Sequence, residues 1–150
     1  MVRRPASHNA NIDDKFHCFS VNAITIAEAG TVEKVNVAEK FKEIEDYWNP
    51  RIVGELNGQQ VKLVRLKGEF VWHHHENEDE MFLVVKGKFR IEFHDRQVWL
   101  NEGEFIVVPR NVEHRPVAEE DAHVLLFEPA STLNTGNVRN ERTRDRLHTL

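Results

Sequence analysis

Two histidines in the middle of the chain are spaced so that both could bind one metal ion. His73 and His75 are separated by one residue in the stretch GEFVWHHHENEDEMFLVVKG, residues 68–87. Alternate side chains of an extended strand project from the same face, so both imidazoles would point the same way. His74 would then point to the opposite face, and we interpret it as a non-ligand. The spacing therefore predicts a pair of nitrogen ligands.

A carboxylate and a third imidazole follow at distances that let them join this pair. Glu80 comes after four intervening residues, which is enough for a short turn into a second strand. His114 lies three residues beyond the turn 109–111 and can arrive from another strand. Three neutral imidazoles and one carboxylate suit a divalent transition metal such as Mn, Fe, Co, Ni or Zn. An octahedral ion with these four ligands would keep two positions for water or substrate.

A run of three histidines can also be a chance surface cluster or the remnant of a tag. The metal interpretation is favoured because the same residues resemble the two motifs of the cupin superfamily, HxHxxxxExxxxxxG and GxxxxxP followed by a His. The matching positions are His73, His75, Glu80, Gly87, Gly103, Pro109 and His114. Gly68 lies one residue closer to the first His than in the family pattern. Asn111 stands where Gly is usual, and Asn tolerates the left-handed conformation better than most residues.

The resemblance implies a small β-barrel with one metal inside, held by His73, His75, Glu80 and His114. It also implies a homodimer, which outward aromatic positions such as Trp72 and Trp99 favour as well. The motifs are specific for fold and metal and leave the reaction open.

Strand alternation selects one candidate for a catalytic base. Glu69 shares the face of His73 and His75 if their strand is regular, although it sits beside a Gly turn, where carboxylates are ordinarily solvated. The same rule predicts an inward apolar stripe at Phe89, Ile91 and Phe93, and thus a mainly apolar cavity. It leaves open whether His123 lies in the cavity or on the outer face.

Composition restricts the class of protein. A chain of 150 residues with a formal charge of −5 has the length of one domain and lacks the basic excess of a nucleic-acid-binding protein. The single cysteine, Cys18, excludes an internal disulfide. The longest uninterrupted apolar run, 81–85, is far shorter than the roughly 20 residues of a membrane span. We therefore expect a soluble, cytoplasmic protein without nucleic-acid or membrane partners.

Periodicity predicts an all-β protein, an antiparallel sandwich or barrel with one short N-terminal helix, and the resemblance implies the cupin-type jelly-roll barrel, or double-stranded β-helix. An arm covers 1–30, the barrel 31–129 with its leading helix at 37–47, and a polar tail 130–150, whose last ten residues we expect to be poorly ordered or weakly helical. Asn57-Gly58 is a strong hairpin signal. Nine strands are expected at 52–56, 59–66, 70–75, 80–85, 88–94, 97–100, 104–108, 112–117 and 122–128.

Two functions fit this sequence. The first is a metal-dependent enzyme that carries out isomerase, lyase or dioxygenase chemistry on a small molecule. The second is a non-catalytic module that binds or senses a small ligand at its metal. An acid or base in the cavity besides the four ligands would favour the enzyme, and the sequence shows no convincing one.

Overall fold

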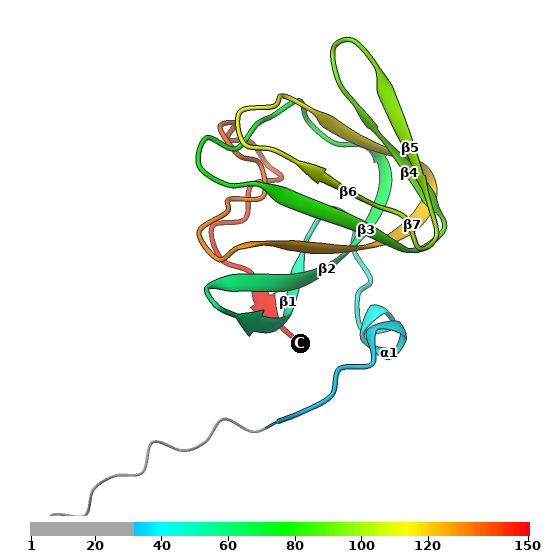
Figure 1. Ribbon diagram of the computed structural model, residues 1–150. Helices are drawn as coiled ribbons and strands as arrows, with labels where there is room; N and C mark the ends of the chain where they lie inside the picture. Colours follow the sequence, from blue (N-terminus) through cyan, green and yellow to red (C-terminus); the bar gives the residue numbers. More distant parts are fainter. Residues whose placement is uncertain (1–31) are drawn as a thin grey trace, which may run out of the picture. The chain divides into compact units, whose positions relative to one another are not determined.

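The computed structural model describes residues 32–150, so the arm predicted for 1–30 lies outside the described residues. These residues form an all-β jelly roll with one short helix, as predicted (Figure 1). The elements are α1 (Val37–Phe41), β1 (Arg51–Leu56), β2 (Gln59–Glu69), β3 (Glu80–Lys86), β4 (Lys88–Glu92), β5 (Gln97–Asn101), β6 (Phe105–Val108), β7 (Arg115–Pro129) and β8 (His148–Thr149).

Helix α1 begins at the predicted residue and ends earlier than the predicted 37–47. The Asn36 side chain caps its start by accepting a hydrogen bond from the Glu39 N–H at 3.2 Å. Beyond Phe41 the chain continues as tight turns, and Trp48 has a φ of 59°, which no α-helix contains. Trp48 is fixed instead by β2, since its N–H donates to the Arg65 carbonyl at 2.9 Å. Ile44 and Trp48, which the longer helix was predicted to carry or to place at its end, are buried from the turns beyond α1.

Hydrogen bonding joins the strands in the order β5-β4-β7-β2-β1-β8, and β3 pairs with both β7 and β6. The sheet is therefore not closed into a complete ring. Strands β1 and β2 form the predicted hairpin, in which Asn57 and Gly58 both have positive φ, of 51° and 77°.

Strand β7 organises this sheet, because it pairs with β2 along one side and with β4 and then β3 along the other. The sequence predicted two strands here, 112–117 and 122–128, separated by a turn. The structure instead has one strand, and the residues expected to turn form an irregularity opposite Leu66–Gly68. A bulge bends a strand without ending it, so β7 can pass from β4 to β3.

The predicted strand 70–75 is also absent. After Glu69 the chain leaves the sheet and keeps one isolated bridge, between His73 and His114. Just before the chain leaves the sheet, the pairing register shifts between Leu66 and Gly68, where Gly68 has a φ of 79°. The histidine segment is therefore extended and lies outside the regular ladders.

The C-terminal segment 130–150 was expected to be loop with a poorly ordered or weakly helical end. It contains no helix, and its last residues form β8, which pairs in parallel with β1 (Figure 1). The Asn137 N–H donates to the His74 carbonyl at 3.0 Å, and the His74 N–H donates back to the Asn137 side chain at 2.9 Å. The segment therefore packs against the histidine-bearing stretch.

The core lies between the strands and includes the predicted stripe. Phe89 and Ile91 are fully buried, and Phe93 is partly buried against the same cluster. Among residues 32–150, no helix has the length and apolar character needed to cross a membrane.

Candidate metal centre

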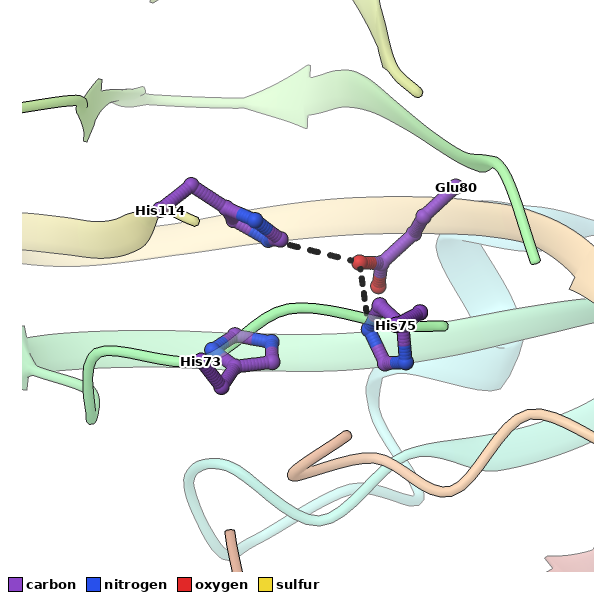
Figure 2. A group of neighbouring side chains, drawn as sticks. All are labelled: His73, His75, Glu80 and His114. Atoms are coloured by element: carbon purple, nitrogen blue, oxygen red, sulfur yellow. Dashed lines mark ion pairs between the residues drawn. The ribbon is translucent and has the colours of Figure 1, made fainter. Parts of the chain in front are cut away.

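Four side chains from separate segments point toward one another (Figure 2). His73, His75, Glu80 and His114 are all buried, and each offers one ligand atom within 4.8 Å of the others. The two neighbouring histidines come from the extended segment after β2, Glu80 is the first residue of β3, and His114 immediately precedes β7. The structure thus brings together the four residues that the sequence selected as ligands.

Backbone contacts between the two motifs hold this arrangement. Glu80 pairs with Val108 of β6, from which the chain turns toward His114. Asn111, in that turn, adopts the left-handed conformation at a φ of 62°, as expected where the family pattern has Gly. Its N–H donates to the His75 carbonyl at 2.7 Å. The turn before one histidine is thereby tied to the backbone of another.

Two of the imidazoles are locked in orientation by their own segments. Nδ1 of His73 lies 3.0 Å from the Val71 carbonyl, and Nδ1 of His114 lies 3.0 Å from the Val112 carbonyl. A carbonyl only accepts, so Nδ1 carries the proton in each ring and a neutral imidazole presents a free lone pair at Nε2. Metal-binding histidines characteristically have this kind of second hydrogen bond.

The atoms that face the centre lack hydrogen-bond partners. Within the described residues, His75 Nε2, Glu80 Oε2 and His114 Nε2 are buried and unsatisfied. The Glu80 oxygen lies 3.2 Å from the first nitrogen and 3.6 Å from the second, without hydrogen-bond geometry (Figure 2). Buried unpaired acceptors that face one another are costly, and a shared cation removes that cost. The residues therefore fit a divalent metal.

Electrostatics favour the protonation state that a metal requires at His73 and Glu80, and oppose it at His75. Burial, together with the neighbouring His114, lowers the pKa of His73 to about 4. Burial also acts to lower the pKa of His75, but the Glu80 carboxylate outweighs it and holds this pKa above the usual value. Burial opposes ionisation of Glu80, whereas the imidazoles of His114 and His75 keep its pKa below the usual value. The site thus combines a carboxylate anion with at least one neutral imidazole at neutral pH.

A cavity of about 40 Å³ adjoins the cluster. Its walls are mainly apolar, as predicted, although Phe89 and Ile91 belong to the core cluster, Phe93 packs against that cluster, and none of the three lines the cavity. The lining residues are Trp48, Pro50, Val64, Leu66, Phe70, His73, Glu80, Phe82, Pro116, Leu126, Glu128 and Asn134.

Glu128 is the cavity residue that sequence reasoning missed. Its carboxylate forms an ion pair of 2.7 Å with Lys62, and the two side chains are only 2% and 1% exposed. Burial and the nearby Glu80 raise the pKa of Glu128, while Lys62 acts in the opposite direction. The signal was available in the strand parity, because Lys62 alternates with Val64 and Glu128 with Leu126, which are inward positions.

Glu69, the candidate base, lies outside this cavity. Its carboxylate is exposed and forms an ion pair of 2.7 Å with Arg115. Parity misplaced it because β2 ends at Glu69 and the histidines lie on a segment outside the regular ladders, so strand alternation does not continue from Glu69 to them. The geometry gives Glu69 no role at the centre.

The two remaining histidines of interest also lie away from the four. His123 lies on the outer face, where its ring stacks on Phe41 of α1 at a centroid distance of 4.4 Å. His74 does not take part in the cluster, in agreement with its interpretation as a non-ligand.

Comparison with known proteins identifies the family. Residues 62–128 match the family described as Cupin domain. The chain is 34% identical over 64 residues to the uncharacterized protein YdbB of Bacillus subtilis, a match that covers 42% of this chain and only 57% of that protein. It is 33% identical over 121 residues to a Bacillus licheniformis protein named acireductone dioxygenase, with 68% of each chain covered.

A solved structure shows the same fold. The crystal structure of a cupin-2 domain containing protein from Shewanella frigidimarina is 42% identical and superposes with a TM-score of 0.63. The match covers 63% of this chain and 93% of that chain.

Proposed function

The chain belongs to the cupin domain family, and from this premise we propose that it is a metal-dependent enzyme acting on a small molecule, with dioxygenase chemistry as the favoured reaction. The observation that carries the proposal is the cluster of three histidines and one glutamate, in which the buried atoms His75 Nε2, Glu80 Oε2 and His114 Nε2 have no hydrogen-bond partner within the described residues. The relative named acireductone dioxygenase favours oxygenation over isomerase or lyase chemistry.

His73, His75 and His114 would hold the metal through neutral nitrogens, and Glu80 through a carboxylate oxygen. One divalent ion of Mn, Fe, Ni, Co or Zn would supply Lewis acidity, and Fe or Mn would add the redox chemistry that oxygenation needs. Glu80 is the one anion among the four, so it lowers the charge of the loaded site from +2 to +1.

The cavity walls would orient the substrate and exclude water from it. Phe70, Phe82 and Leu126 present apolar surface beside His73 and Glu80. In such a dry site the electrostatic interactions of the polar groups are strengthened.

The decisive experiment is elemental analysis of protein purified without added metal. We expect close to one transition-metal ion per chain, and much less in His114→Ala. Oxygen consumption and isomerase activity are then measured against a panel of small molecules that includes an acireductone. Turnover that requires the metal supports the enzyme. A protein that holds its metal and binds panel members without converting any is a binding module, and a protein without metal contradicts the proposal.

A further inference from the structure

The ion pair between Lys62 and Glu128 is placed to do more than hold two strands together. Both side chains are almost completely buried, and the Lys62 Nζ contacts Glu128 Oε1 at 2.7 Å. The second carboxylate oxygen, Oε2, is buried and has no hydrogen-bond partner among the described residues. Glu128 lines the same cavity as His73 and Glu80, whereas Lys62 does not line it. A residue with an unsatisfied buried oxygen therefore forms part of the wall beside the metal centre.

Stability does not account for this pair. A buried ion pair gains little over well-packed apolar residues, because the desolvation of two charges offsets their attraction. The positions that alternate with the pair on the inner face, Val64 and Leu126, are apolar and buried. An apolar pair would therefore suit the fold, and an unsatisfied buried oxygen in a cavity is characteristic of a functional site.

We propose that Glu128, oriented by Lys62, hydrogen-bonds a hydroxyl group of the small molecule that the cavity binds. A hydroxyl group donates to a carboxylate and accepts from a carboxylic acid, so it satisfies Oε2 in either protonation state. Lys62 fixes the other oxygen, which leaves this one free for the ligand. Glu128 thereby selects hydroxylated ligands.

The cavity also restricts the size of that ligand. Its volume is about 40 Å³, which favours a small ligand. The ligand class is then a small hydroxylated carboxylate or carbonyl compound, whose other oxygen atoms would face the four-residue cluster. This inference rests on the proposed metal-dependent function.

Two nearly isosteric probes test the inference by binding alone. Glycolate carries a hydroxyl group, and fluoroacetate carries fluorine in its place, which neither donates nor accepts strongly. The affinities of both are measured by calorimetry on zinc-loaded protein, for the wild type and for the double variant Lys62→Met/Glu128→Met. Removing both partners avoids leaving one buried charge unpaired.

We expect the preference for glycolate over fluoroacetate to fall by about 10- to 100-fold in the double variant, as for a hydrogen bond to a charged group. Fluoroacetate affinity and zinc content should stay near the wild-type values. Glu69→Gln is the matched control, because this exposed acid lies outside the cavity and its loss should leave the preference unchanged.

A milder variant, Glu128→Gln, allows the same test if the double variant fails to fold. Lys62 would orient the amide oxygen and leave the amide N–H groups toward the ligand, so the glycolate preference should fall by only about three- to tenfold. A wild-type preference retained in zinc-loaded variant protein overturns the inference and leaves the proposed function intact. Wild-type protein that takes up no zinc overturns both.

Discussion

The backbones of His73 and His114 hydrogen-bond each other in both directions, with N–H to carbonyl oxygen distances of 3.1 and 2.9 Å. Each ring then bonds to the carbonyl two residues before it, Val71 in one segment and Val112 in the other. The two segments therefore present their imidazoles in matching fashion. Because backbone and local carbonyls fix both rings, the ligand geometry exists before a metal arrives.

Metal removal should lower the thermal stability of the protein. The ion would tie together the segments that carry His75, Glu80 and His114, and a ligand that binds only the folded state stabilises it by mass action. We expect a chelator to lower the melting temperature of wild-type protein. The chelator should have no such effect on His75→Ala or His114→Ala.

His74→Ala is the control for this series, and its metal content should stay near that of the wild type. Full metal retention in His114→Ala would show that the ligand assignment is wrong.

Glu80→Gln should show how much the negative charge of Glu80, as distinct from its size, contributes to the metal centre. Gln keeps the size and one oxygen donor but removes the anion that offsets the metal's charge. We expect a folded protein whose metal affinity is about 10- to 100-fold weaker, judged by what smaller changes around metal ligands cost. Turnover should stay depressed even at saturating metal, as measured by steady-state kinetics over a metal titration. Recovery of full turnover would contradict the role assigned to this carboxylate.

The metal-free protein should lose stability in mild acid because of His73. Its pKa is about 4 in the folded state and near 6.5 in the unfolded chain, so the unfolded state binds more protons between these values. The contribution of His73 is therefore complete above pH 6.5 and is lost as the pH falls toward 4, by up to about 3 kcal/mol.

Urea unfolding at pH 7, 5.5 and 4.5 measures this effect as the difference between wild type and His73→Gln. The comparison cancels the contributions of Glu80 and of His75, whose pKa shifts in the opposite direction. Parallel pH profiles of the two proteins would refute the prediction.

Gly136→Ala, a substitution in the C-terminal segment, should displace the histidine-bearing stretch of the metal centre. Gly136 has a φ of 52°, and a β-carbon there would overlap the His74 carbonyl oxygen and lie 3.3 Å from the His73 ring. We expect a loss of about 1–3 kcal/mol in unfolding free energy and a weaker metal affinity. Gly54→Ala is the control, because its β-carbon would meet nothing within 4 Å. Equal melting temperatures and metal contents for the two variants would rule out this coupling.

We also expect the protein to be a homodimer. The consecutive strands β5 and β6 carry three exposed apolar side chains, which is unusual for side chains of this size. They are Trp99, Phe105 and Val107, with exposed fractions of 39%, 63% and 50%. Trp72, the other aromatic residue behind this expectation, is half-buried and stacked on His94, so it offers less surface.

Light scattering at micromolar concentration should return the mass of a dimer for the wild type. Phe105→Ser should shift it toward a monomer, whereas Leu56→Ser, at an exposed position on β1, should not. A monomeric wild type would remove the expectation.

Local patterns predicted the parts of the fold that local physics determines. Asn57-Gly58 specifies its hairpin through positive φ angles, and the alternation at Phe89 and Ile91 separates inside from outside. The spacing of the metal-centre residues also allowed their convergence to be anticipated. The continuity of β7 could not be predicted, because the bulge between its two halves is stabilised by pairing with distant strands.

The cavity chemistry was harder to anticipate for the same reason. Lys62 and Glu128 are 66 positions apart, and although parity puts each on the inner face of its strand, a charged residue alone is more often a solvated one. Only their pairing makes burial of both tolerable. Glu69 shows the converse error, because its parity was counted beyond the end of β2, along a segment that no longer alternates as a strand.

The central place of β7 also affects how the chain folds while it is being synthesised. Residues of β2 pair with β7 residues roughly 50 to 70 positions further along, from Glu69 with Val117 to Gln59 with Pro129. At typical elongation rates of about 5–20 residues per second, β2 waits about 3 to 14 s on the ribosome for this partner. Its buried residues Leu63, Val64 and Leu66 lack their main cover during that interval. Nascent chains stalled before β7 should therefore be the species that aggregates or engages chaperones.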